Sequence, residues 1–276
     1  MAVVVGVERS EKGKLKASDV QAIVTHGGTA HTDDFLAVAV LLTLFPEATV
    51  YRVSKVDESK YLENTIFVDV GGRYDGQKFF DHHHDPNLPC SLILVLKKFF
   101  PDVPTDIDEL RWIDDWDRLG GPKTQKKWGV KLPEFRDPIS ASIIDVFSNY
   151  TNIPFFDPLH MVLQKIGKTF LEFLRKQGEY LEIARNAEVF EVKGVKVVRL
   201  DKGIPIRFIK KIHPDVGVVV QPNQRMPEAM SVIRIDDHPK VDFHRISVPT
   251  HFIHPTGFMA VVDPEYVDRA LEEAIE

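Results

Sequence analysis

Three clusters of histidine and aspartate lie in the first third of the chain, and each follows a short apolar run. They occupy residues 25–34, residue 69 with its two following glycines, and residues 81–84. Packing gives no reason to place carboxylates at strand ends, whereas imidazole and carboxylate groups are common ligands of divalent cations. The pattern therefore predicts a metal site.

The first cluster offers His26, His31 and Asp33 as donors within a short glycine-containing loop. Three suitable donors so close together are more specific than a single loop histidine, so we expect them to bind metal. Asp34 directly precedes an apolar helical segment, where a helix-capping role explains it at least as well. We therefore leave Asp34 out of the expected ligand set.

The other two clusters support a metal site to different degrees. Asp69 alone is typical of a turn residue, but beside the other clusters its two oxygens could bridge a pair of cations. In the third cluster, one imidazole of His82 or His83 can ligate a metal while Asp81 orients a ring and fixes its tautomer. His84 has no assigned role.

Two further segments allow competing interpretations. Asp117 lies in an acidic helical run with Asp114 and Asp115, and a solvated helix face is the more ordinary explanation of that run. His254 and Gly257 lie between apolar runs, where a core histidine in a β-turn is the simpler interpretation. The residues alone therefore do not assign these positions to a site.

The segments around the first clusters alternate between strand-like and helix-like patterns. Apolar or β-branched runs are followed by helix-length apolar segments at residues 21–25, 34–44, 49–53, 65–70, 79–80 and 91–99. This alternation predicts an α/β fold with a mostly parallel sheet flanked by helices. The carboxyl ends of such strands meet in one crevice, which would bring the three clusters together.

The pattern changes further along the chain. Helical spacing at 107–119 and 138–184 gives way to short β-rich pieces, a tight turn at Lys193 and Gly194, and a final helix over 264–275. We expect a catalytic domain at 1–185, including linker helices, and a smaller α+β domain at 186–276. The catalytic cleft is expected between them.

Composition limits the classes of protein. The chain has 276 residues, 43% of them hydrophobic, which suffices for real cores. The lone Cys90 excludes an internal disulfide framework and a cysteine-rich zinc site. Because no apolar run approaches about 18 residues and no signal peptide is recognisable, we expect a cytoplasmic protein without membrane contact. The net charge of −6 disfavours a protein that grips long duplex nucleic acid.

The order of the clusters resembles that of the DHH superfamily of metal-dependent phosphoesterases. More closely, residues 25–34, 68–75 and 80–83 resemble the melanocyte proliferating gene family, which is associated with 3′ to 5′ RNA exonuclease activity. The resemblance spans nearly the whole chain, but it is thin in the second half, where only a short His-x-x-Gly-Phe pattern matches. It implies that the first domain is of the DHH type.

The resemblance also implies roles for individual residues. One cation would be held by His26, His31 and Asp69, and the other by Asp33, Asp69, His82 and Asp117. Asp114 is the rival of Asp117, and the usual superfamily motif has an aspartate where His31 stands.

Substrate contacts follow from the same resemblance. His83 would reach the substrate phosphate, with Asp81 behind the ligands. His254, Gly257 and, more weakly, Arg245 would bind the phosphate or the terminal nucleotide.

The expected chemistry is hydrolysis of phosphoester bonds. Two divalent cations about 3.5 to 4 Å apart can activate a shared hydroxide and neutralise charge on phosphorus. Ligands without thiolate favour Mn(II) or Mg(II), although Co(II) or Zn(II) could occupy the site.

We expect the substrate to be short or single-stranded RNA rather than DNA, cleaved from its 3′ end. A phosphatase for pyrophosphate or a small nucleotide such as pAp is one alternative, and a non-catalytic metal-binding module is another. The oligomeric state is open, a homodimer included.

Overall fold

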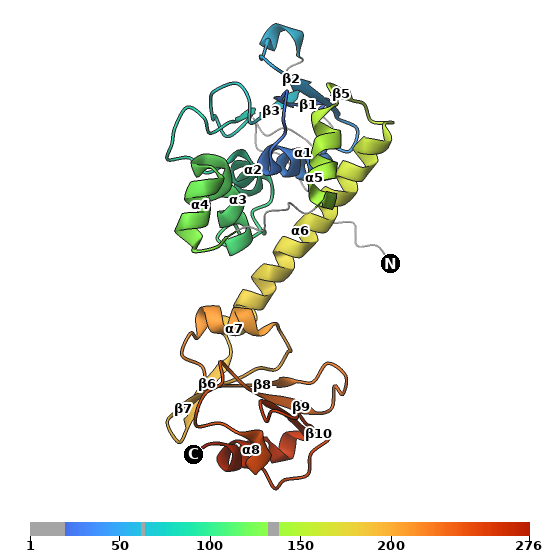
Figure 1. Ribbon diagram of the computed structural model, residues 1–276. Coiled ribbons are helices and arrows are strands. Elements are labelled where there is room, and N and C mark those ends of the chain that lie inside the picture. The colour runs from blue at the N-terminus through green and yellow to red at the C-terminus, as the bar shows by residue number, and fades with distance from the viewer. Residues whose placement is uncertain (1–19, 62–63, 132–137) are drawn as a thin grey trace. The chain divides into compact units, whose positions relative to one another are not determined.

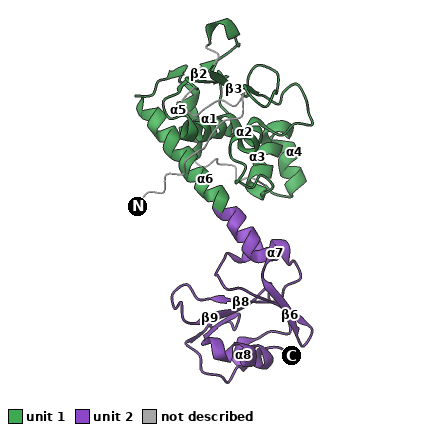
Figure 2. Cartoon of the chain, turned by 180° about the vertical axis from the view of Figure 1, so that it is seen from behind, with its two compact units in different colours: residues 1–175 green, residues 176–276 purple. Residues whose placement is uncertain are grey.

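The computed structural model describes residues 20–61, 64–131 and 138–276. The chain divides into two compact units, Met1–Arg175 and Lys176–Glu276 (Figure 2). Each unit contains one β-sheet together with helices, so the α/β class is confirmed (Figure 1). The predicted boundary after residue 185 and the predicted cleft stay predictions. Within the described residues, no helix is both long and apolar enough to cross a membrane.

The sheet of unit 1 is mostly parallel, as predicted. Its strand order is β4-β3-β1-β2-β5. The first four of these strands run parallel to their neighbours, and the short edge strand β5 is antiparallel to β2. The strands are β1 (Ala22–His26), β2 (Thr49–Val53), β3 (Thr65–Val68), β4 (Phe79–Phe80) and β5 (Asn152–Ile153).

The register of this sheet determines where the candidate site residues lie. Thr25 of β1 pairs with Val68 of β3, and Val68 pairs in turn with Phe80 of β4. The residues that come next along the chain, His26, Asp69 and Asp81, therefore leave the sheet at the same edge. Parallel pairing thus turns a separation of many residues in sequence into proximity in space.

Helices cover this sheet, and α1 is the most deeply buried of them. They are α1 (Thr32–Leu44), α2 (Ser91–Phe99), α3 (Asp108–Leu119), α4 (Gly121–Trp128), α5 (Pro138–Ser148) and α6 (Pro158–Arg185). Residues 37–42 of α1 have no exposed surface, as expected for a helix that is apolar all round.

Helix α6 crosses α1 in direct backbone contact. A Cβ atom built on Gly167 would lie 2.0 Å from the carbonyl oxygen of Ala39, so only glycine permits this approach. The side chain of Gln164 adds a hydrogen bond to the carbonyl of Leu42 at 3.2 Å. This crossing fixes α1, whose first turn carries part of the candidate site.

Two elements of unit 1 were not predicted. Helix α4 is lysine-rich, with few apolar positions to reveal its period, and it begins directly after Gly120. It is tied to α3 because Asp115 accepts hydrogen bonds from Lys127 and Trp128. Strand β5 interrupts the helical segment predicted over 138–184, in a stretch that ends at Pro154.

Unit 2 has a six-stranded sheet in the order β10-β11-β9-β8-β7-β6. Its elements are β6 (Glu188–Val192), β7 (Val195–Arg199), α7 (Ile206–Ile212), β8 (Val218–Pro222), β9 (Met230–Arg234), β10 (Phe252–Ile253), β11 (Met259–Val262) and α8 (Val267–Ala274). Lys193 and Gly194 both have positive φ, which confirms the predicted hairpin turn. The predicted final helix begins instead with a short 3-10 turn, Pro264–Tyr266. Helix α7 and strands β10 and β11 were not predicted.

Candidate metal centre

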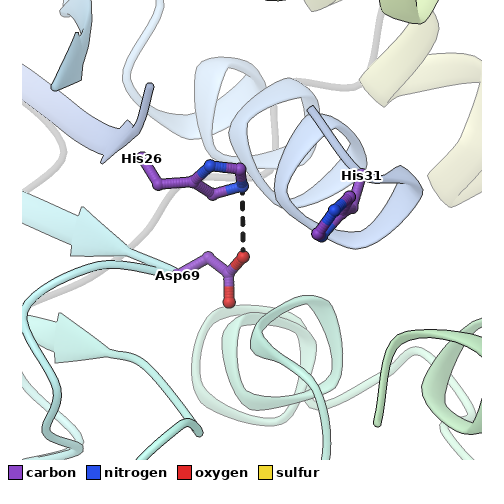
Figure 3. A group of neighbouring side chains, drawn as sticks. All are labelled: His26, His31 and Asp69. Carbon is purple, nitrogen blue, oxygen red and sulfur yellow. Dashed lines mark ion pairs between the residues drawn. The ribbon is translucent and has the colours of Figure 1, made fainter. Parts of the chain in front are cut away.

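His26 and Asp69 face each other at the carboxyl ends of β1 and β3. Nε2 of His26 lies 3.5 Å from Oδ2 of Asp69, and the ring of His31 approaches the same space from the start of α1 (Figure 3). Nδ1 of His26 lies 3.0 Å from the carbonyl oxygen of Gly27. Donation to that carbonyl leaves Nε2 as the nitrogen with a free lone pair, which is the form that binds metal.

Asp69 lies in a strained turn. Its φ of 55° is in the left-handed region, which aspartate tolerates better than most residues but which still costs energy. The following Gly71 also has a positive φ, and a Cβ built there would lie 3.0 Å from the ring of Phe79. The two glycines after Asp69 thus allow the chain to turn away while the carboxylate stays in the site.

His82 lies between two carboxylates. Its Nε2 atom is 2.9 Å from Oδ2 of Asp117 and 3.4 Å from Oδ1 of Asp69. Asp117, on the last part of α3, also lies 3.5 Å from Nδ1 of His31. Asp117 thus joins the strand-end residues to the first turn of α1.

Buried ligand atoms without hydrogen bonds concentrate here. Buried polar atoms in folded proteins almost always have hydrogen-bond partners, so a cluster of atoms that lack them indicates a bound group. Among the described residues, the site atoms with no such partner include Nε2 of His26, both oxygens of Asp33, Oδ2 of Asp34 and Oδ2 of Asp69. Nε2 of His82 and Oδ2 of Asp117 also make no hydrogen bond, but they face each other as an ion pair at 2.9 Å. Imidazole nitrogens and carboxylate oxygens in this arrangement fit divalent cations.

Three overlapping groups of residues could each hold a metal ion. They are His26, His31 and Asp69; Asp69, His82 and His83; and His31, Asp33 and Asp117. Every residue predicted to ligate a metal belongs to at least one group, and Asp69 and His31 each belong to two. The structure therefore brings the predicted ligands together, while their binding of metal stays a prediction.

The buried carboxylates have strongly displaced pKa values. Burial raises the pKa of Asp33 well above its ordinary value, and the charges of Asp69 and Asp117 raise it further. Burial also raises the pKa of Asp34 to about 6. Without a cation, these carboxyl groups therefore hold a proton more tightly than usual, and a bound cation would favour their ionised form instead.

His82 and Asp117 shift in opposite directions. Burial alone would lower the pKa of His82, but its contacts with Asp117 and Asp69 outweigh burial and raise the pKa to about 10. Burial would likewise raise the pKa of Asp117, but His31 and His82 outweigh it and lower that pKa. Without metal, protons on the imidazoles thus balance part of the carboxylate charge.

Asp34 is held mainly by protein groups. Its Oδ1 atom accepts a hydrogen bond of 2.6 Å from the backbone N–H of His31, which caps the start of α1. Its Oδ2 atom lies 3.4 Å from Nε2 of His26 and 3.9 Å from the guanidinium of the buried Arg52. The expectation that Asp34 precedes the helix as its N-cap is therefore corrected, because His31 is the N-cap and Asp34 is the third residue of α1, from which it accepts the N–H of His31.

Asp81 orients His83, as the sequence predicted. Oδ1 of Asp81 lies 2.7 Å from Nδ1 of His83 and accepts the backbone N–H of the same residue at 3.0 Å. Oδ2 accepts the backbone N–H of Gly72 at 2.6 Å. The hydrogen bond to Asp81 raises the pKa of His83. It also engages Nδ1, which leaves Nε2 of a half-exposed ring for another partner.

The acidic run on α3 separates into distinct roles. Asp114 accepts a hydrogen bond of 2.6 Å from the backbone N–H of Cys90 at the start of α2, and it pairs with Arg118 at 3.0 Å. Asp115 holds α4. Only Asp117 of the three belongs to a possible metal-binding group in the described chain. The geometry therefore favours Asp117 over its rival Asp114.

Two supporting residues were not predicted. The buried Ser91 donates a hydrogen bond of 2.8 Å to Oδ1 of Asp69. The buried Arg52 of β2 donates to the carbonyl of Gly28 at 3.1 Å and to the carbonyl of Phe147 at 3.0 Å. A serine at a helix start or an arginine in a strand gives no sequence signal of such a role.

The residues predicted to bind substrate in the second domain lie in unit 2. The ring of His254 packs 4.3 Å from that of Phe258, and its Nδ1 atom lies 3.0 Å from the hydroxyl of Thr256. Gly257 has a positive φ. Arg245 pairs with the side chain of Glu276 at 2.8 Å. Their role in substrate binding stays a prediction.

Comparison with known proteins agrees with the cluster pattern. Residues 22–87, which contain most of the candidate ligands, match the model of the MYG1 exonuclease family, described as Uncharacterised protein family (UPF0160). This part of the chain is similar to the MYG1 family. The predicted resemblance is therefore confirmed for this segment, while DHH superfamily membership stays a prediction.

Named MYG1 relatives match over the same short region. A MYG1 protein of Saccharomyces cerevisiae is 44% identical over 71 residues, which is 25% of this chain and 21% of the relative. Proteins named MYG1 exonuclease from Homo sapiens and Bos taurus are 46% and 47% identical over 78 and 66 residues. These matches cover 26% and 22% of this chain, and 20% and 16% of the relatives. The matched segment spans about a fifth of each MYG1 relative.

Proposed function

We propose that this protein is a metal-dependent phosphodiester hydrolase that removes nucleotides from the 3′ end of short or single-stranded RNA. The observation that carries the proposal is the cluster of buried ligand atoms that lack hydrogen bonds around Asp69. Two divalent cations, with Mn(II) preferred, are its proposed cofactors. The mammalian relatives are named MYG1 exonuclease, which supports a nuclease activity.

The proposed ligand sets share Asp69. His26 and His31 with Asp69 would hold one cation, and Asp33, His82 and Asp117 with Asp69 the other. Asp69 belongs to two of the possible metal-binding groups, as His31 does, but only its carboxylate offers two oxygens, of which Oδ2 faces His26 and Oδ1 faces His82, and this supports a bridging role. The hydrogen bond from Ser91 would hold the carboxylate plane in the orientation that bridging needs.

Bound cations would lower the pKa of a water molecule and neutralise the negative charge that accumulates on the phosphate. The protein itself would contribute a hydrogen-bond donor to the substrate, His83. Because Asp81 engages Nδ1 of His83 and raises its pKa, the protonated ring presents Nε2–H. The ring of His83 is 59% exposed, so Nε2–H can donate to a phosphate oxygen of a bound substrate.

The test is hydrolysis of a 5′-labelled single-stranded oligoribonucleotide by purified protein with manganese. We expect a ladder of products shortened from the 3′ end, abolished by chelator and reduced at least about a hundredfold in Asp69→Asn. The control variant is Asp102→Asn, which removes only an exposed ion pair with Arg175. Wild-type turnover by Asp69→Asn would contradict the proposal.

Parallel substrates separate the alternatives. DNA of the same sequence tests the RNA preference, and pyrophosphate and pAp test a small-molecule phosphatase. Manganese binding without hydrolysis of any of these substrates would favour a non-catalytic module. The cytoplasmic location and the oligomeric state stay predictions.

A further inference from the structure

A cavity of about 970 Å³ opens beside the candidate metal centre within unit 1. Its walls come from the loop and first turn of α1, from α3, and from α5. The lining residues that matter here are His31, Asp33, Asp117, Trp112, Trp116 and Asp145. The volume is at the upper end of the range typical of small-molecule sites.

The cavity and the metal centre are continuous. His31, Asp33 and Asp117 form one of the possible metal-binding groups and also line the cavity. A ligand whose phosphate lies at this group would therefore have its adjoining part inside the cavity. In a nucleotide, that part is the ribose with its base.

Two tryptophans give the cavity an aromatic wall. The rings of Trp112 and Trp116 lie 5.7 Å apart and are inclined by 30°, and both side chains are only half-buried. Trp116 lies against Gly121, where a Cβ atom would come within 2.7 Å of the indole. Trp128 supports Trp112 edge-on at 5.6 Å, but it is not among the described residues that line the cavity.

Partly exposed indoles beside a phosphate-binding site are suited to nucleobases. Every base has a flat face that stacks on an aromatic side chain, largely without regard to sequence. The carboxylate of Asp145 and the hydroxyl of Thr29 supply polar groups on the wall. These groups can accept or donate hydrogen bonds to a base or a ribose, which a purely hydrocarbon ligand could not use.

We propose that this cavity binds the base of the nucleotide whose phosphate lies at the metal centre, by stacking on Trp112 or Trp116. The inference deepens the proposed function and rests on it for the identity of the phosphate. Binding of the base is measured without any hydrolysis of RNA. The base-binding proposal and the proposed function can therefore be contradicted independently of each other.

The chain provides a built-in reporter. It has three tryptophans in all, and they lie in α3 and α4 at this cavity or directly behind it. Tryptophan fluorescence emission of the full chain therefore reports on this cavity and the residues around it. The probes are AMP and ribose 5-phosphate, titrated with manganese present, because the two differ only in the base.

We expect AMP to quench the emission and to bind at least about tenfold more tightly than ribose 5-phosphate, as one stacked base contributes. Whichever of the two tryptophans stacks on the base, its leucine variant, Trp112→Leu or Trp116→Leu, should lose most of this preference, while the remaining tryptophans serve as reporters. Trp128→Phe, the matched control, should keep it. Because the comparison of the two probes uses the wild-type protein, it stands even if Trp112→Leu does not fold.

Equal affinities for AMP and ribose 5-phosphate, or no quenching by AMP, would overturn the inference. An unchanged preference in folded Trp112→Leu and in Trp116→Leu would also overturn it. A protein that prefers AMP but hydrolyses no RNA supports the base site and contradicts the proposed function. A protein that hydrolyses RNA but binds AMP no more tightly than ribose 5-phosphate supports the proposed function and contradicts the base site.

Discussion

Nε2 of His82 lies 2.9 Å from Oδ2 of Asp117, although one residue follows strand β4 and the other lies in the last turn of α3. The contact, together with Asp69 beside His82 and His31 beside Asp117, raises the pKa of His82 to about 10 and lowers that of Asp117. In the metal-free protein this ion pair stabilises the fold fully between the unfolded pKa values of about 3.9 for Asp117 and about 6.5 for His82. The stabilisation is lost as pH rises from there toward 10, and also as pH falls below about 3.9. The same proton must leave before the imidazole can bind a metal.

Metal binding should therefore release protons. We expect the apparent affinity for manganese to rise with pH from 6 to 8, by about tenfold per unit for each proton released. Isothermal titration calorimetry in two buffers of different ionisation enthalpy measures the number of protons. Binding that is independent of both pH and buffer would contradict the role of His82.

Asp33→Asn should stabilise the metal-free protein. Burial raises the pKa of Asp33, so the folded state binds its proton more tightly than the unfolded chain, and stability falls as pH rises above about 3.9. At pH 7.5 with chelator, the variant should therefore be more stable than the wild type in urea unfolding. With manganese, the melting temperature of the wild type should rise and that of the variant should not. A variant that is less stable with chelator and still stabilised by manganese would contradict this expectation.

Asp117→Asn and Asp114→Asn should behave differently. Asp117 lies beside His31 and His82, so its amide variant should lose most manganese binding. Asp114 instead pairs with Arg118 and accepts the N–H of Cys90, so its variant should lose about 1 kcal/mol of stability and keep the metal. Manganese titration followed by electron paramagnetic resonance distinguishes the two. The reverse pattern would make Asp114 the ligand.

Ser91→Ala should weaken metal binding without abolishing it. The hydroxyl of Ser91 orients Asp69, and the loss of such a support lowers affinity by about 10- to 100-fold. Ser231→Ala is the matched control, because Ser231 is also a buried serine but lies in β9 of unit 2. Equal affinities in the two variants would show that Ser91 does not act through Asp69.

Gly167→Ala should destabilise the fold, although Gly167 itself lies outside the candidate site. Its new methyl group would collide with the backbone of Ala39, which cannot move without displacing α1. We expect a loss of about 3 kcal/mol or more in urea unfolding. Lys168→Ala, on the exposed side of the same helix, should stay within about 0.5 kcal/mol of wild type. A small effect of Gly167→Ala would mean that the two helices can separate.

The sequence predicted the strands that position the site because their signals are local. Apolar runs that end at His26 and just before Asp69 read directly as buried strands, and parallel pairing brings their ends together. The choice between Asp114 and Asp117 could not be made from sequence, because it depends on how far α3 is rotated. Nothing local distinguishes an acidic helix face turned toward solvent from one turned toward a metal.

Other features were hidden because they depend on distant contacts. Arg52 reads as an ordinary strand residue, yet it joins β2 to the carbonyls of Gly28 and Phe147. The cavity combines residues of α1, α3 and α5, whose adjacency no periodicity reveals. Helix α4 has too few apolar positions to be seen in the pattern.

Anomalous diffraction at the manganese edge, from crystals grown with manganese, tests the central claim most directly. We predict two peaks that share Asp69, one beside His26 and His31 and the other beside Asp33, His82 and Asp117. Crystals of Asp69→Asn, grown in the same way, should lose at least one of them. A wild-type map with no peak at Asp69 would contradict a two-metal centre here.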